Sequence, residues 1–282
     1  MKDKRRMLTM VTNDDGVQSP GIIALAESLS KYSDVAIVGP EGPQSAAGMS
    51  LTFHKPLRVN RVLVKKWGCY AVSGSPADCI MVGVNKILPR RPQIVVSGIN
   101  IGDNVTIQDI LASGTVAAAL EAALMGIPAI AFSMDVPEER TFLLGSSYPE
   151  FTAAAEVAAE ITREVLERGL PRGVEMLNVN FPWMVNSGTE VRITSVERRK
   201  YKDYVIERKD PRGKPYYWLW GARLPQVRQN SDAYAVQRAR AISVSPITLN
   251  FSSPIQQEMA RMGERIRERM KVLSRKFSIM HK

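Results

Sequence analysis

Two adjacent aspartates, Asp14 and Asp15, follow an apolar run at residues 7–11 that has the length of a short buried strand. Like charges side by side repel each other, and this pair is predicted to lie at the edge of a hydrophobic core. A divalent cation bound beside them would offset both charges. The pair is therefore the first candidate for chemistry in this chain.

Three further polar clusters follow apolar segments, at residues 44–48, 97–100 and 113–115. Ligands in open α/β sheets bind beyond the carboxyl ends of the strands, so we expect these loops to meet at one edge of a sheet. Carboxylate, hydroxyl and amide oxygens are the donors that Mg²⁺ or Mn²⁺ prefers. The chain has only two histidines, which argues against a histidine-rich zinc site.

The last of these clusters, Ser113-Gly114-Thr115, opens an alanine-rich segment that is predicted to be a helix. Backbone N–H groups at a helix N-terminus lack intrahelical partners and bind phosphate readily. A cation beside a phosphate cradle predicts hydrolysis of a phosphate ester by a metal-activated water. Other phosphate chemistries fit less well. The chain has no P-loop, no Gly-x-Gly-x-x-Gly after the first strand, and no Asp-x-Asp spacing of the haloacid-dehalogenase type.

Each cluster also has a purely structural explanation. Asp14-Asp15-Gly16 can be a plain turn in which an aspartate caps a helix. Asn100 can be a turn residue that tolerates left-handed backbone, Ser113 can be only a helix cap, and Ser45 can be ordinary loop polarity. The joint placement of these residues at strand ends is what favours the functional interpretation.

Alternating strand-like and helix-like segments must position these clusters. Expected strands cover residues 7–12, 35–38, 94–97, 129–134 and 176–181. Expected helices follow Ser19, Ser75 and Ser113, which are good capping residues, and a long helix is expected at residues 149–168. The alternation predicts an α/β fold with a doubly wound, mostly parallel sheet.

The pattern changes after about residue 190. Two extended segments, separated by the turn signal at residues 210–214, predict a β-hairpin that projects from the main sheet. A short strand at residues 242–245 and a terminal helix at residues 254–276 are expected to follow. We expect three parts: a catalytic core at 1–190, an extended hairpin or oligomerisation region at 191–240, and a C-terminal strand and helix at 241–282.

The net charge of +10 is concentrated in the last third of the chain. Residues 1–190 hold 17 Lys and Arg against 20 Asp and Glu, whereas residues 191–282 hold 21 against 8. The basic third fits a solvated or oligomer-facing surface, or a surface that steers an anionic substrate. Nucleic acid is the least favoured partner, because no nucleic-acid-binding motif accompanies the charge.

The sequence gives no sign of a membrane or secreted protein. Its apolar segments are shorter than the roughly 18 residues of a membrane span, and too few apolar residues follow the basic N-terminus for a secretory signal. The two cysteines, Cys69 and Cys79, give no metal-ligand spacing. We therefore expect a cytoplasmic protein with reduced thiols and no membrane partner.

Several motifs of the chain resemble those of the SurE survival proteins, a family of metal-dependent nucleoside monophosphate phosphatases. The main matches are Thr12-Asn-Asp-Asp-Gly-Val-Gln-Ser-Pro-Gly21, Ser73-Gly-Ser-Pro-Ala-Asp-Cys79, Val96-Ser-Gly-Ile-Asn100, Ser113-Gly-Thr-Val116 and Ser231-Asp-Ala-Tyr-Ala-Val236. The resemblance covers nearly the whole chain. It implies hydrolysis of nucleoside 5′- or 3′-monophosphates to nucleoside and phosphate.

The resemblance also implies roles for individual residues. Asp14, Asp15, Ser45 and Asn100 match the family's ligands for one Mg²⁺ or Mn²⁺ per subunit, and one of the two aspartates would also orient or deprotonate the attacking water. The expected phosphate contacts are Asn13, Ser113, Gly114 and Thr115. The implied fold is a Rossmann-like globule with a protruding hairpin and a C-terminal region swapped between the subunits of a dimer or tetramer. Either the terminal helix or the strand at residues 242–245 would cross between the chains.

The chain departs from the family pattern in the segment between Asn100 and Ser113. The usual Gly-x-Asn-x-Gly is replaced at residues 102–106, the segment is one residue longer, and Ala112 stands where an aromatic residue or histidine is usual. These changes are expected to line the substrate pocket. They leave two alternatives open, a phosphatase of short polyphosphate or small phosphorylated metabolites, and a non-catalytic nucleotide-binding regulatory protein.

Overall fold

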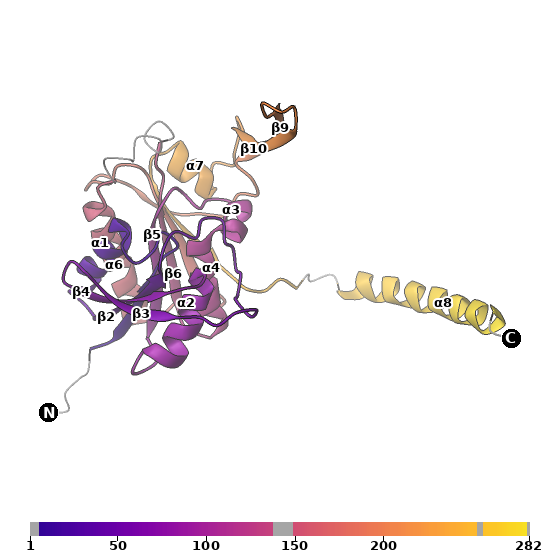
Figure 1. Ribbon diagram of the computed structural model, residues 1–282, viewed down its shortest axis with the longest axis horizontal. Helices are drawn as coiled ribbons and strands as arrows, with labels where there is room; N and C mark the ends of the chain where they lie inside the picture. Colours follow the sequence, from indigo (N-terminus) through magenta and orange to yellow (C-terminus); the bar gives the residue numbers. More distant parts are fainter. Residues whose placement is uncertain (1–5, 138–148, 253–255, 281–282) are drawn as a thin grey trace. The chain divides into compact units, whose positions relative to one another are not determined.

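The computed structural model describes residues 6–137, 149–252 and 256–280 (Figure 1). The chain divides into two compact units, residues 1–248 and residues 249–282. The first unit contains a nine-stranded sheet with flanking helices and a separate two-stranded hairpin. The second contains one long helix, α8 (Gln256–Met280).

The main sheet is mostly parallel, as predicted. Its strand order is β3-β4-β2-β1-β5-β6-β7-β11-β8, and every neighbouring pair from β4 to β7 is parallel. Every residue of β1 and β6 is buried, which is expected of strands covered on both faces. The strands are β1 (Leu8–Thr12), β2 (Asp34–Pro40), β3 (Val59–Val64), β4 (Trp67–Val72), β5 (Ile94–Ile101), β6 (Ala129–Met134), β7 (Met176–Phe181), β8 (Val191–Ile193) and β11 (Ile242–Ile247).

Helices cover the sheet in two pairs. Helix α1 packs against α6, and α2 packs against α4; Figure 1 shows the two pairs on opposite sides of the central strands. The fold is therefore the doubly wound α/β arrangement that the sequence predicts. Among the described residues, the helices of this unit are α1 (Pro20–Leu29), α2 (Pro76–Val82), a π-helical turn (Gly83–Ile87), α3 (Ile107–Ala112), α4 (Gly114–Leu124), α6 (Thr152–Arg168) and α7 (Asp232–Gln237).

Serine caps fix the start of two helices beside the strand ends. The Ser75 hydroxyl accepts the N–H of Asp78, and the Asp78 carboxylate accepts the N–H of Ser75, so the two residues form a capping box. The Ser113 hydroxyl accepts the N–H of Val116 at 3.2 Å. Ser19 stands at the N-cap position of α1 and Pro20 begins the helix, as expected, but the Ser19 side chain makes no capping hydrogen bond.

Most of the predicted core elements are confirmed, with ends shifted by a few residues. The antiparallel pair β3–β4 was not expected, because its apolar residues are interleaved with polar ones and β3 lies partly exposed at the sheet edge. The short helices α3 and α7 were also not expected. A helix of only six residues shows less than two full turns of apolar periodicity, so the pattern is weak.

The predicted hairpin is confirmed. Strands β9 (Tyr201–Lys209) and β10 (Pro215–Arg223) pair antiparallel along their whole length and form a sheet of their own, which projects from the main sheet (Figure 1). The terminal helix is also found, as α8. Within the described ranges, no helix is long and apolar enough to cross a membrane.

Candidate functional site

Loops from separate parts of the chain meet at the carboxyl ends of β2, β1 and β5, which are neighbours in the sheet. Asp14 and Asp15 follow β1, Ser45 lies in the loop after β2, and Asn100 lies near the end of β5. Together with Ser113, which caps α4, they line one cavity of about 280 Å³. The side chains expected to bind the metal therefore face a shared space.

An irregularity in β5 brings Asn100 to this cavity. The pairing of β5 with β6 shifts in register between Ser97 and Asn100, and bulges of this kind re-aim a side chain. Gly98 has a φ of +128°, and a Cβ there would lie 2.2 Å from the carbonyl oxygen of Phe132, so only glycine fits. The Asn100 amide nitrogen donates to the Gly102 carbonyl at 2.8 Å, which leaves the amide oxygen to act as a ligand.

Asp14 is held against the start of α4. The Thr115 hydroxyl donates to Asp14 Oδ1 at 2.5 Å. A Cβ on Gly114 would lie 2.8 Å from the Asp14 Cβ, so this close approach needs glycine. The N–H of Gln44 donates to the Asp14 carbonyl oxygen at 2.7 Å and links the loop that carries Ser45. Burial nevertheless raises the pKa of the Asp14 carboxyl above its ordinary value.

Asp15 is in a still less favourable environment for a charge. Burial, followed by the neighbouring Asp14 carboxylate, raises the pKa of Asp15 to about 7, although the backbone N–H of Ile101 opposes the shift. Its Oδ2 atom is buried and makes no hydrogen bond in the described structure. Two adjacent carboxylates with raised pKa values and an orphaned oxygen are what a bound cation would relieve.

The donor set fits a hard divalent cation. Two carboxylates, a hydroxyl and an amide oxygen suit Mg²⁺ or Mn²⁺ better than zinc. Across the residues that the structure describes, no group of three or more His, Cys, Asp and Glu is arranged to hold a metal. A cation at this cavity would therefore depend on the neutral oxygens of Ser45 and Asn100 as well as on the aspartates.

The expected phosphate contacts fall into two groups. Ser113 lines the cavity, whereas Gly114 and Thr115 lie directly behind Asp14. Asn13 is buried outside the cavity lining, and its amide donates to the Gly16 carbonyl at 2.9 Å. To contact phosphate through that amide, Asn13 would have to give up the hydrogen bond that closes the Asp-Asp-Gly turn.

The cavity has a second acidic wall, which the sequence did not reveal. This wall is formed by Asp103 and Asp109, and the cavity lining contains no histidine or cysteine. The buried Lys200 pairs with both carboxylates. Burial raises the pKa of Asp109 to about 6, even though Lys200 opposes the shift. The only sequence signal was that these aspartates lie in the segment that departs from the family pattern. Nothing in the sequence connects them to a lysine some hundred residues away.

Hydrogen bonds from distant strands hold this wall in place. The N–H of Asn104 donates to Asn180 Oδ1 at 2.7 Å, and the Asn178 amide donates to the Asn104 carbonyl at 2.9 Å. The N–H of Thr106, whose φ is +84°, donates to Asp232 Oδ2 at 2.8 Å. The segment is thus fixed by β7 and by α7, and Asp232 belongs to the motif at residues 231–236.

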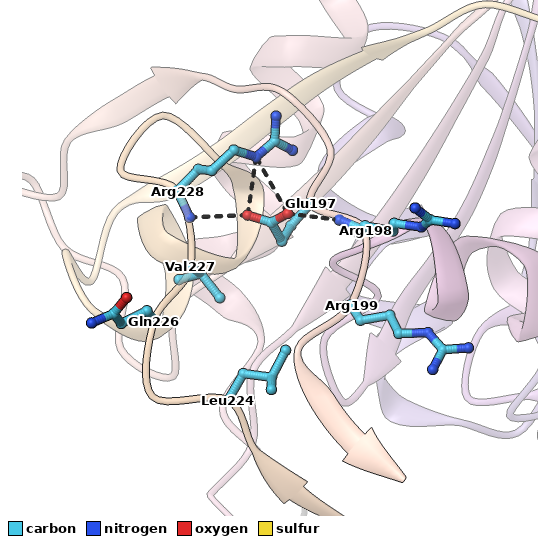
Figure 2. A pocket seen from close by; sticks show the side chains of 7 residues that line it. All are labelled: Glu197, Arg198, Arg199, Leu224, Gln226, Val227 and Arg228. Carbon is cyan, nitrogen blue, oxygen red and sulfur yellow. Dashed lines mark hydrogen bonds and ion pairs between the residues drawn. The ribbon is translucent and has the colours of Figure 1, made fainter.

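A larger cavity, of about 430 Å³, lies at the base of the hairpin, and Figure 2 shows its lining. Its carboxylate, Glu197, accepts the backbone N–H groups of Arg198 and Arg228 and the Arg228 side chain. This carboxylate is already paired, so it braces the hairpin base and is a poor candidate for catalysis. The cavity lined by Asp14 and Asp15 is the better candidate active site.

The chain is similar to known proteins in both sequence and structure. Residues 9–203 match the family model "Survival protein SurE". The chain is 39% identical over 246 residues to the 5′-nucleotidase SurE of Methanocella arvoryzae (86% of this chain, 92% of that protein). It is 46% identical over 251 residues to the 5′-nucleotidase SurE of Geobacter sulfurreducens (88% and 90%). The crystal structure of the SurE protein from Aquifex aeolicus superposes with a TM-score of 0.78 at 34% identity, covering 91% of this chain and 99% of that one. The chain therefore belongs to the SurE family.

Proposed function

We propose that this protein is a 5′-nucleotidase of the SurE type, which hydrolyses nucleoside 5′- or 3′-monophosphates to nucleoside and phosphate. The observation that carries the proposal is the convergence of Asp14, Asp15, Ser45 and Asn100 on one cavity at the start of α4. The relatives named 5′-nucleotidase SurE, at about 40% identity over most of the chain, support the same activity.

We assign one Mg²⁺ or Mn²⁺ per subunit to Asp14, Asp15, Ser45 and Asn100. Such a cation, when bound, polarises a phosphoryl oxygen and lowers the pKa of a coordinated water. The chemistry of the donors supports the assignment, as does the buried Asp15 Oδ2 that lacks a partner. One of the two aspartates, Asp14 or Asp15, would also orient or deprotonate the attacking water.

The phosphate group is assigned to the start of α4. Ser113 lines the cavity, and the N-terminus of this helix favours negative charge. Thr115 holds Asp14 by its hydroxyl and so fixes the carboxylate relative to that phosphate position. The chain's own residues would thus bind the phosphate, orient the carboxylates and exchange a proton with water.

Phosphate release from a nucleotide panel tests the proposal. EDTA should abolish release, and Mn²⁺ or Mg²⁺ should restore it. Asp14→Asn should lower kcat roughly 100-fold or more, because interactions that hold a metal-bound nucleophile contribute several kcal/mol. Circular dichroism checks that the variant folds.

Three results would point elsewhere. Full activity in excess EDTA would rule out the assigned cation. Faster release from tripolyphosphate than from any nucleotide would favour a polyphosphatase. Tight nucleotide binding without phosphate release, with either metal present, would favour a regulatory protein.

We also propose that the protein is a homo-oligomer, a dimer or tetramer, in which the region 191–240 and α8 contact other subunits. The hairpin exposes Val205, Tyr217, Trp218 and Leu219, and exposed apolar patches of this kind usually mark interfaces. Helix α8 exposes Met259, Met262, Ile266 and Met270. Strand β11 lies inside the sheet of its own chain, so the exchanged element is α8 in this proposal.

A further inference from the structure

Lys200 is a buried cation at the point where the hairpin begins. Its side chain is 7% exposed and it immediately precedes β9. Its ammonium donates to Asp103 Oδ1 and, at 3.5 Å, to the Asp103 carbonyl oxygen, and it forms an ion pair with Asp109 Oδ2 at 2.7 Å. Burial lowers the pKa of Lys200, but Asp103 and then Asp109 outweigh burial, so the pKa is raised and the lysine is charged.

The two carboxylates that Lys200 contacts belong to the cavity wall. Asp103 and Asp109 line the same cavity as Asp14 and Asp15, so four carboxylates surround a space of about 280 Å³. A phosphate monoester carries up to two negative charges near neutral pH and would be repelled by such a wall. An anion can enter only if both carboxylate pairs are offset.

The positions of Asp103 and Asp109 also depend on groups outside the cavity. Gln237 of α7 donates to Asp103 Oδ2 at 2.7 Å, so both oxygens of Asp103 are held. The nearby Asp135 has its own cation, Arg240, at 3.4 Å. Lys200 is the cation that contacts the Asp103–Asp109 pair directly among the residues described.

We infer that Lys200 is a positioning residue that holds Asp103 and Asp109 in the cavity wall and offsets their charge, so that the anionic phosphate of the substrate can enter. This inference rests on the proposed phosphatase function. Lys200 contacts the wall from behind and has no assigned contact with substrate. Its role is therefore to lower the barrier to anion binding and not to take part in the bond-breaking step.

Lys200→Met tests this directly at pH 8. The KM for a nucleoside monophosphate should rise at least tenfold, while kcat changes less than threefold. The matched control is Lys202→Met, which removes the same charge from an exposed position two residues along the strand and should leave KM unchanged. The triple variant K200M/D103N/D109N removes the charge imbalance and should restore KM to within about threefold of the wild type. A triple variant with KM still raised tenfold would overturn the inference.

Ligand binding measured without turnover distinguishes an electrostatic role of Lys200 from a structural one. Titration calorimetry should show inorganic phosphate binding at least tenfold more weakly to Lys200→Met, whereas uncharged adenosine should bind within twofold of the wild type. Equal weakening of both ligands would mean a merely structural role and would contradict the inference. A wild type without phosphatase activity would reject the proposed function. The comparison of phosphate with adenosine binding would still test the role of Lys200, because binding needs no catalysis.

A second variant covers the case in which Lys200→Met does not fold. Asp109→Asn keeps Lys200 paired with Asp103 and removes one negative charge from the wall. Phosphate should then bind several-fold more tightly at pH 8. Unchanged or weaker phosphate binding by a folded Asp109→Asn protein would overturn the inference on its own.

Discussion

Asp15 has a buried carboxyl group whose charge is opposed by its surroundings. Burial and then Asp14 raise its pKa to about 7, whereas the unfolded chain titrates near 3.8. Between these two values the unfolded chain has lost the proton and the folded chain keeps it. The free energy of unfolding of the metal-free protein should therefore fall as pH rises from about 4 to about 7, and Asp15 should add no further loss above that.

Asp15→Asn should remove this loss. In EDTA, we expect the variant to be more stable than the wild type by about 2 kcal/mol at pH 8, and equal to it at pH 4. The full shift would give about 4 kcal/mol, but residual contact with solvent reduces it. Urea unfolding at both pH values measures the difference, and Asp34→Asn provides the same charge change at an exposed site. An equal gain at both pH values would count against a buried charge as the cause.

Mn²⁺ should reverse this order of stability. A ligand that binds only the folded state stabilises it in proportion to its affinity, and Asp15→Asn removes one of the assigned carboxylates. The melting temperature of the wild type should therefore rise on addition of Mn²⁺, while that of the variant should rise much less. Identical shifts in the two proteins would place the cation elsewhere.

At the level of single residues, the sequence reveals the site residues that lie at the end of a predicted strand, because that position can be read from the neighbouring residues alone. Asp14 and Asp15 lie just after β1, and Asn100 lies near the end of β5, so their convergence follows from the order of parallel strands. The pairing of Lys200 with Asp103 and Asp109 is different. It depends on how the chain returns to the sheet through β8 and β11 after the core is complete, and no local spacing encodes that return.

At the level of elements, α7 and the segment that carries the acidic wall form one structural unit. Asp232 accepts the N–H groups of Thr106, Glu197 and Ala233, each at 2.8 Å, and is fully buried. Glu197 in turn offers its carbonyl oxygen to the N–H of Ile107, at 2.8 Å. The left-handed backbone of Thr106 is unfavourable for a β-branched residue, so it persists only while these partners hold it.

Asp232→Ala should therefore release the wall as well as weaken the fold. Leaving buried N–H groups unpaired costs about 1–3 kcal/mol each, and we expect a loss of about 3 kcal/mol in the free energy of unfolding. Activity at a temperature where the variant is folded should fall at least tenfold. Asp210→Ala is the matched control, because Asp210 also accepts two backbone N–H groups but lies in the hairpin turn. Loss of stability with full activity would mean that Asp232 does not position the wall.

Elements that carry a long pattern of apolar residues could be predicted from the sequence. Short elements that depend on tertiary contacts could not. The buried strands β1 and β6 and the amphipathic helix α6 each carry a clear pattern. Helix α7 has only six residues, and its hydrophobic contacts with Val105 are tertiary. The sequence pattern of a short helix is too brief to overcome the competing turn signals around it.

At the level of the whole molecule, the basic residues of the last third of the chain have more than one role. The last third carries a net charge of +13 and residues 1–190 carry −3, yet the basic third is not uniformly a solvated surface. Lys200 is buried behind the wall of the candidate active site, where it pairs with Asp103 and Asp109, and Arg228 pairs with Glu197 at the hairpin base. Helix α8 is the part in which the basic residues are exposed beside an apolar stripe.

The stripe on α8 suggests a role in assembly. Met259, Met262, Ile266 and Met270 recur at helical spacing and are each at least 44% exposed. Methionine side chains adapt readily to a partner surface, and exchange of an identical element is an accessible route to a dimer. We therefore expect light scattering to give at least twice the 31.3 kDa of a single chain at micromolar concentration.

Charged substitutions on the stripe should reduce that mass. The double variant M262E/I266E places two carboxylates in the apolar stripe, whereas Arg265→Glu changes the charge of the same turn on its polar face and is the matched control. We expect the double variant to shift toward the single-chain mass and the control to keep the wild-type mass. A wild type of 31.3 kDa would refute assembly altogether. A double variant of unchanged mass, combined with a loss of assembly in Leu219→Glu, would assign the interface to the hairpin and not to α8.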